Sequence, residues 1–105
     1  MNKQRRKELK EQIEKLDDIK KDLDALMGRL EDVKTNIESI KDDEEMAYDN
    51  LPESLQDGEK GSLMQDAMNS MEDAIDGIDF IIDELNGMDS NFSDAIDRID
   101  EAIQC

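Results

Sequence analysis

Apolar residues recur every three or four positions through the first half of the chain, and this spacing predicts one long helix. Leu9, Ile13 and Leu16 open the series, and from Ile19 onward the steps alternate between four and three. Such alternation is the a/d pattern of a coiled coil. The step from Leu16 to Ile19 is three residues where the pattern requires four, so we expect a stammer there. The helix is expected over about 3–48. The later members of the series are Ile19, Leu23, Leu26, Leu30, Val33, Ile37 and Ile40.

The second half carries a wider apolar stripe over about 62–104. Every d and g position is apolar, and so is every a position except Asp89. A stripe over a, d and g exceeds what a two-stranded coiled coil buries, so we expect this helix to meet more than one neighbour. Ser62 and Gln65 have the spacing of a capping box and place its start. The d residues are Met64, Met71, Ile78, Leu85, Phe92 and Ile99; the a residues are Met68, Ile75, Ile82, Asp89, Ile96 and Ile103; the g residues are Ala67, Ala74, Ile81, Met88, Ala95 and Ala102.

Turn-forming residues separate the two helices at about 49–61. The segment holds the only proline, Pro52, together with Gly58 and Gly61, and we expect these two glycines to end any short helical turn that forms within it. A connection of about 13 residues is long for a helical bundle, so we expect a short helical turn near Pro52 within it. Asn86 and Gly87 offer a second break and a three-helix alternative. The heptad pattern continues across them and favours one continuous helix.

Two helices of nearly equal length around a central turn predict an all-α fold. We expect residues 1–105 to form a single domain, a long antiparallel helical hairpin of the coiled-coil type. Two helices alone give a thin core, and thin cores are marginally stable. The wide stripe of the second helix therefore indicates that two hairpins pair into a dimeric four-helix bundle. Asp89, in the apolar seam, is expected to mark a kink, a register device or a local opening.

The composition excludes most catalytic and metal chemistry. The 105 residues include no His, no Trp and one Cys, so the usual catalytic triads lack their base and zinc lacks its ligands. The Asp-rich stretches do not have EF-hand spacing, and carboxylates on a convex helix form no glycosidase pocket. No apolar run has the length of a membrane span, and no signal-peptide core follows the basic start. We expect a non-enzymatic, cytosolic protein without cofactor, metal or membrane contact.

Charge is distributed very unevenly along the chain. Residues 1–41 hold 11 basic and 10 acidic residues, a net charge of +1, whereas residues 42–105 hold 2 basic and 20 acidic residues, a net charge of −18. The whole chain has a formal net charge of −17, which repels nucleic-acid phosphates, so we expect no direct contact with nucleic acid. An acidic helix is either a solvated, solubilising face or the binding surface for a cationic partner.

The acidic residues of the second helix are the candidate binding residues. Apart from Asp89 they occupy positions b, c, e and f, which face away from the apolar stripe. Carboxylates three or four residues apart on a helix are separated by about 5–6 Å, similar to phosphates along a nucleic-acid strand. Phe80, at position f, is a candidate contact anchor. The candidate acidic residues are Asp66, Glu72, Asp73, Asp76, Asp79, Asp83, Glu84, Asp94, Asp97, Asp100 and Glu101.

The turn and the second helix resemble a known group of proteins. The string Tyr48-Asp49-Asn50-Leu51-Pro52-Glu53-Ser54-Leu55-Gln56, followed by Gly58-Glu59-Lys60-Gly61 and acidic heptads, is similar to small uncharacterised acidic helical-hairpin proteins of Gram-positive bacteria, phages and mobile elements. The resemblance implies no activity, only a phage and mobile-element setting. Small acidic phage proteins are often inhibitors of host defence, including anti-CRISPR proteins that imitate DNA, and this analogy suggests a similar role here.

Two functional hypotheses follow. The first is an inhibitor whose acidic face imitates nucleic acid and occupies the basic nucleic-acid-binding surface of a host-defence or nucleic-acid-processing protein. The second is a structural coiled-coil oligomerisation module whose acidic face only solubilises it. The first predicts a basic protein partner that salt releases, because screening weakens contacts between opposite charges. The second predicts a stable homo-oligomer without such a partner.

Overall fold

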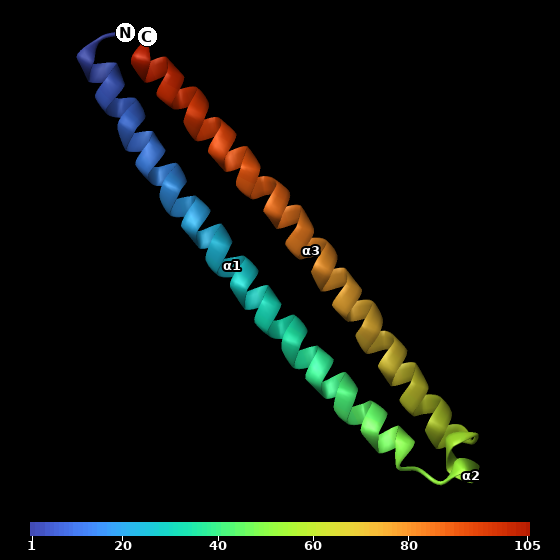
Figure 1. Ribbon diagram of the computed structural model, residues 1–105. Coiled ribbons are helices and arrows are strands. Elements are labelled where there is room, and N and C mark those ends of the chain that lie inside the picture. The colour runs from blue at the N-terminus through green and yellow to red at the C-terminus, as the bar shows by residue number, and fades with distance from the viewer. The chain divides into compact units, whose positions relative to one another are not determined.

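The computed structural model describes all 105 residues, which form three helices and no strands. α1 spans Lys3–Asp49, α2 spans Glu53–Gln56 and α3 spans Glu59–Gln104 (Figure 1). The prediction of an all-α fold with two long helices is therefore confirmed. α2 is the short helical turn expected near Pro52, and that proline immediately precedes its first residue. α3 continues through Gly87, so the prediction of one continuous helix is confirmed. The alternative, in which the second long helix breaks at Asn86 and Gly87, is wrong.

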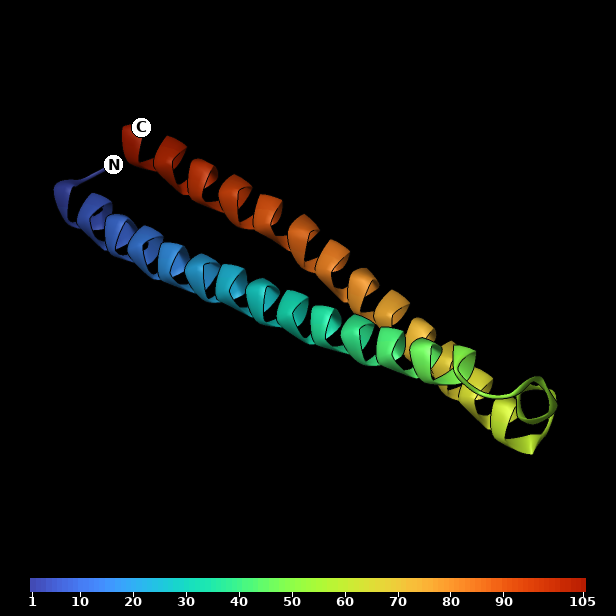
Figure 2. The ribbon, with the colours of Figure 1, turned by 60° about the horizontal axis from the view of Figure 1, so that its bottom comes forward.

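The chain forms two compact units, each built from one segment of α1 and one segment of α3. The first unit comprises residues 1–29 and 82–105, and the second comprises residues 30–81, which include α2. Within each unit the two segments of α1 and α3 run antiparallel (Figures 1 and 2). In the second unit, for example, Lys34 pairs with Asp79, and Lys41 pairs with Glu72. The second lysine lies seven residues after the first, whereas its carboxylate partner lies seven residues before the first partner, as an antiparallel arrangement requires. The prediction that two long helices pair is confirmed.

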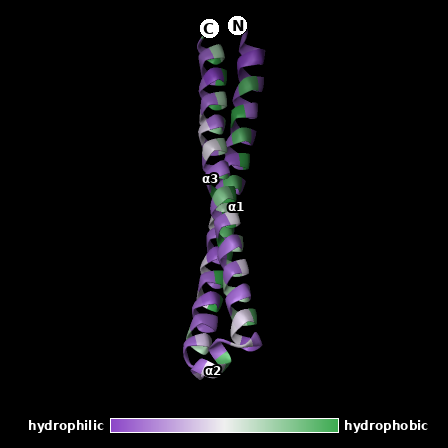
Figure 3. Ribbon diagram, turned by 90° about the vertical axis from the view of Figure 1, so that its right-hand side faces the viewer, coloured by the Kyte–Doolittle hydropathy of each residue, from purple (hydrophilic) through white to green (hydrophobic).

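The a and d positions of α3 form its seam, as the heptad pattern predicted. All the predicted a and d residues are buried or half-buried, and Ile75 and Ile82 are the most buried of them. Among the g positions only Ala102 is half-buried, and the others are exposed. Pairing with α1 therefore covers two of the three apolar lines on α3. Apolar and hydrophilic residues alternate along both helices in Figure 3.

α1 packs through a different set of residues from the predicted one. Its half-buried and buried residues follow one regular heptad, in which Leu16 is succeeded by Lys20 and Leu23. The predicted stammer after Leu16 is therefore wrong, because the step to Lys20 is the regular four. One of the two predicted lines beyond that point lies outside the seam, with side chains 43–58% exposed. The residues of this outer line are Ile19, Leu26, Val33 and Ile40.

α2 packs directly against the first turn of α3 at Gly61. A Cβ atom on Gly61 would overlap the carbonyl oxygen of Gln56 and lie 2.7 Å from its Cα atom. Gly61 thus lies inside α3, so the prediction that it belongs to the turn is wrong, whereas Gly58 separates α2 from α3 as predicted. Ser62 does not cap the helix either, because its N–H donates to the carbonyl oxygen of Gly58 at 3.0 Å in the regular helical pattern. Since glycine permits the close contact with α2, α3 begins at Glu59, earlier than the capping box predicted.

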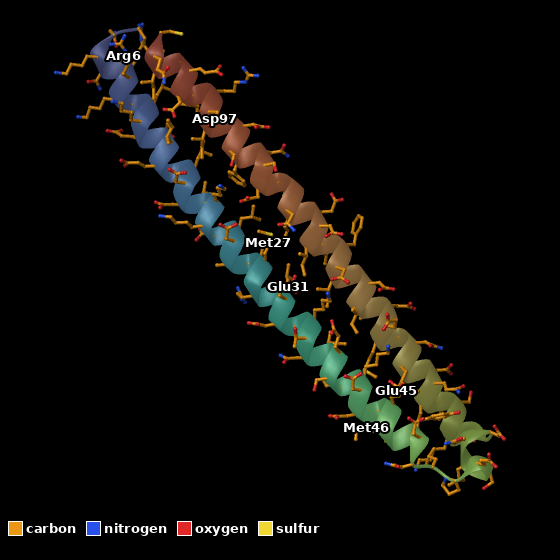
Figure 4. The ribbon with its side chains drawn as sticks, viewed as in Figure 1. Arg6, Met27, Glu31, Glu45, Met46 and Asp97 are labelled. Atoms are coloured by element: carbon orange, nitrogen blue, oxygen red, sulfur yellow. The ribbon has the colours of Figure 1, made fainter.

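In the first unit residues at the start of the chain donate hydrogen bonds to backbone carbonyl groups at its end. Asn2 Oδ1 accepts a hydrogen bond from the N–H of Arg5 at 2.8 Å, which caps α1. Arg6, labelled in Figure 4, donates from Nε to the carbonyl oxygen of Ile103 at 3.1 Å, and the amino terminus donates to that of Cys105 at 3.2 Å. α3 has no basic residue in its last turn, so the basic start of α1 supplies the positive charge that a helix C-terminus favours.

Candidate functional site

The candidate acidic residues lie along the outer side of α3. Ten of the eleven are exposed, and only Asp79 is half-buried. They all lie within one uninterrupted helix, so their spacing along the axis is fixed by the helical repeat. Figure 4 labels Asp97 among the carboxylates of α3. The assignment of these residues to a binding surface remains a prediction.

In the second unit an exposed aromatic ring lies in the same line of α3 as outer acidic residues. Asp66 and Asp73 share position f with Phe80, and Asp76 lies one turn before that ring on the same helix. Phe80 is 65% exposed, the largest exposed fraction among the large apolar residues of the chain. Phe80, at position f, thus lies outside the seam, as the heptad pattern predicted. An aromatic ring with this exposure supplies apolar contact area beside the carboxylates.

In the first unit the outer side of α3 is also dominated by carboxylates. Asp83, Asp94 and Asp97 are exposed and form no ion pair. Arg98, the one basic residue of this segment, donates from Nη1 to Glu101 Oε2 at 3.2 Å. Both partners of that pair are highly exposed, so it contributes little to stability. The surface remains strongly negative.

Two lysines that the sequence analysis did not single out join α1 to α3 in the second unit. Lys34 Nζ lies 2.7 Å from Asp79 Oδ1, and Lys41 Nζ lies 2.6 Å from Glu72 Oε2. Hydrogen bonds to these carboxylates are the main cause that raises the pKa of each lysine above its usual value. The two pairs are seven residues apart on both helices, but no pattern within either helix indicates which carboxylate each lysine meets. They neutralise part of the charge at Glu72 and Asp79.

These ion pairs border a polar cleft of about 360 Å³ between α1 and α3. The cleft is wide open to solvent, and its residues contain no nucleophile of the Ser, Cys or Thr type. No group of three or more acidic or Cys side chains is placed to hold a metal ion. The residues that line the cleft are Lys34, Glu38, Lys41, Asp42, Glu72, Ile75, Asp76 and Asp79.

Asp89 stands apart from the other acidic residues. It is half-buried in the seam of the first unit, and its Oδ1 atom is buried without a hydrogen-bond partner. A buried acceptor without a donor costs about 1–3 kcal/mol. α3 continues through this position as a regular helix, so Asp89 does not interrupt it. Its side chain is therefore a source of instability in the seam and not part of the outer acidic surface.

Three further findings bear on function. No helix of the chain combines the length and the apolar character that a membrane crossing requires. Cys105 is exposed and its thiol is free. A scan of known protein families, a search of curated proteins and a search of solved structures each returned no match to this chain.

Proposed function

We propose that the protein is a non-enzymatic acidic binding protein that imitates nucleic acid and occupies the basic nucleic-acid-binding surface of another protein. In the setting that the turn sequence suggests, it is a phage or mobile-element inhibitor in the cytoplasm of the bacterial host. Its target is then a host-defence protein, in the manner of an anti-CRISPR protein, or a nucleic-acid-processing protein.

One observation carries this proposal: most of the outer carboxylates of α3 have no cationic partner in the chain. Glu72, Asp79 and Glu101 form ion pairs, and the other eight candidate acidic residues form none. Like charges one helical turn apart destabilise a helix by a few tenths of a kcal/mol per pair. The unpaired residues are Asp66, Asp73, Asp76, Asp83, Glu84, Asp94, Asp97 and Asp100.

A basic groove would recognise this surface by charge and by spacing. Lys and Arg side chains that normally contact phosphates would pair with carboxylates about one helical turn apart. Unlike a flexible acidic tail, the helix holds its carboxylates in fixed rows, so less conformational entropy is lost on binding. The exposed ring of Phe80 lies within these rows and would anchor the contact.

The proposal is tested by reversing charge on α3 and by a matched reversal on α1. In the α3 variant, Asp73, Asp76, Asp83 and Asp97 are replaced by Lys. In the α1 variant, the exposed residues Glu11, Glu14, Asp18 and Asp32 are replaced by Lys. Each set changes the formal charge from −17 to −9. Immobilised wild-type protein and both variants are exposed to lysate of a Gram-positive host, and a 20-base-pair DNA duplex is used as competitor.

We expect the wild type to retain nucleic-acid-binding proteins that the duplex and moderate salt both release. The α3 variant should lose them, and the α1 variant should keep them, because only the first set disrupts the rows on α3. Circular dichroism checks that both variants stay helical. Equal binding by the two variants, or capture of proteins that the duplex cannot displace, would show that the rows do not imitate nucleic acid.

We also propose that two chains pair into the four-helix bundle anticipated from the wide stripe of α3. The exposed g positions of α3 support this architecture, because they leave an apolar line for a further helix. The same observation favours a second candidate function, a structural oligomerisation module with a merely solubilising acidic face. That function predicts a stable oligomer and no DNA-displaceable partner in the capture experiment.

A further inference from the structure

The two sides of the second unit differ in chemistry. The heptad that α1 follows in the structure has Lys34 at position a and Ile37 at position d. One side of the unit is the polar cleft, which is lined by Glu38 at position e of α1 and by Glu72 and Asp79 at position e of α3. In an antiparallel pair of helices the e positions of both helices flank one side of the seam and the g positions flank the other. The g positions of α1 and α3 therefore share the side opposite the cleft.

This opposite side carries exposed apolar residues from both helices, and we call it the apolar face. Among its members, Val33 is 47% exposed, Ile40 is 58% exposed, Leu63 is 62% exposed and Ile81 is 45% exposed. The alanines between them at the g positions of α3 are exposed too. The apolar face comprises Val33, Ile40, Leu63, Ala67, Ala74 and Ile81.

Charge is absent from the α3 part of the apolar face. Between Leu63 and Ile81, positions c and g are occupied only by uncharged residues, among them Ser70 and Gly77. Charged residues make up 41% of the chain, and those of this segment lie at b, e and f. A solvated helix surface has no physical reason to exclude charge, whereas the core of a protein interface does. The steps between these c and g residues alternate between four and three, which is the repeat of a second seam.

The chain also exposes more surface than a compact monomer of the same mass. The chain exposes 7613 Å², whereas a compact monomer of its mass of 12.0 kDa exposes about 6000 Å². The excess of about 1600 Å² falls within the range that each chain of an obligate dimer buries, about 1000–2500 Å². Only Leu23, Ile75 and Ile82 are buried apolar residues, so the helix pair has little core of its own.

The first unit, taken by itself, has the same exposed apolar g line, whereas its c positions on α3 include the charged residues Glu84 and Arg98. Its outer line on α1 includes Ile19 at 49% exposed and Leu26 at 43% exposed, and its g position on α3 includes Met88 at 50% exposed. These residues occupy the same heptad positions as the apolar face of the second unit. The uncovered line is thus a property of both units and not of the turn.

We infer that the apolar face is the surface on which a second copy of this chain binds, through its own apolar face. This inference rests on the four-helix pairing proposed above and names its interface. A core of three buried side chains needs cover whenever the chain is folded, and a second copy is always available to provide it. An uncharged apolar surface is complementary to itself, as a two-fold interface requires. The outer acidic residues at b, e and f remain free in such a dimer.

The test compares adjacent positions of α3 on and off the apolar face. Ala74→Glu and the milder Ser70→Glu place a carboxylate on the interface side of α3, and Asn69→Glu places one at position b as the control. All three residues are exposed in the single chain, so only a partner distinguishes them. Sedimentation equilibrium of the purified protein gives the mass of the assembly without any added ligand. The concentrations, about 1 to 100 μM, cover dissociation constants on the order of those expected for an interface of this size.

We expect the wild type and Asn69→Glu to have twice the chain mass, and Ala74→Glu to need at least tenfold higher concentration to pair. If Ala74→Glu unfolds when dilute, Ser70→Glu should still show weakened pairing while folded. A monomeric wild type would overturn the inference, and so would equal pairing by Ser70→Glu and Asn69→Glu. Failure of DNA-displaceable capture with an intact dimer would overturn only the proposed mimicry, so the two failures are distinguishable.

Discussion

Replacing Gly61 with Ala tests whether α2 is docked on the first turn of α3. The added Cβ would overlap the carbonyl oxygen of Gln56 and lie 2.7 Å from its Cα atom, whereas ordinary van der Waals contact begins at 3.4 Å. The atoms in its way belong to the backbone, so α2 must move by roughly 1 Å. Gly28→Ala is the matched control, because nothing lies within 4 Å of a Cβ there and α1 is a regular helix at that position.

The expected magnitudes have opposite signs. Overpacking costs about 1–3 kcal/mol, and the higher helix propensity of alanine returns about 0.5–1 kcal/mol. Gly61→Ala should therefore lower the free energy of unfolding by about 1–2 kcal/mol, whereas Gly28→Ala should raise it by about 0.5–1 kcal/mol. In urea these changes move the midpoint by roughly 0.5–1 M in opposite directions.

Two spectroscopic signals make the assay specific. Circular dichroism at one fixed chain concentration follows the helices. Tyr48, the only tyrosine, follows the turn by fluorescence, since its hydroxyl accepts a hydrogen bond from Gln65 Nε2 at 2.9 Å. Gly61→Ala should change the Tyr48 emission of the folded protein, and Gly28→Ala should not. If Gly61→Ala stabilised the chain as much as Gly28→Ala does, the docking of α2 would be refuted.

Three further variants probe the seam and the helix start. Asp89→Leu should raise the free energy of unfolding by about 1–3 kcal/mol, because it removes a buried oxygen without a partner; a decrease in the urea midpoint would contradict this. The pKa of Lys34 and of Lys41 is raised in the folded chain. Their ion pairs therefore stabilise the fold fully below the unfolded lysine pKa of about 10.4, and this contribution is lost as the pH rises through the higher folded pKa. Urea midpoints measured from pH 9 to 12, a window spanning that loss, should therefore fall more steeply for the wild type than for a double Lys→Met variant at these positions. Parallel slopes for the two proteins would exclude the ion pairs as the cause of the pH dependence. Asn2→Ala should cost about 1 kcal/mol of cap energy and speed amide hydrogen exchange at Arg5, and unchanged exchange there would mean that the cap is not formed in solution.

Much of the fold follows from local patterns in the sequence. α3 places every predicted a and d residue in its seam, because its apolar lines are bounded by acidic residues that water must solvate. The two long helices begin and end within three residues of the predicted limits. The acidic rows were predictable too, since residues outside an apolar stripe face outward on any helix.

The face that α1 turns toward α3 was decided only by the tertiary structure. The line of Leu23 has an apolar line that includes Ile19 on one side and a mixed line that includes Lys20 on the other, so α1 has two ways to form a seam. The sequence analysis chose the line of Ile19, whereas the structure places the line of Lys20 against α3. In the second unit the choice brings Lys34 and Lys41 to carboxylates on α3, and no single-helix pattern contains that pairing.

The start of α3 shows the same division between local and tertiary information. Ser62 and Gln65 form a valid local cap, but contact between Gly61 and the backbone of Gln56 extends the helix past it. Periodicity along one helix determines which residues avoid water, because that depends on each side chain alone. Which of those residues meet each other depends on charges and shapes contributed by segments far away in the chain, and only the folded structure brings these together.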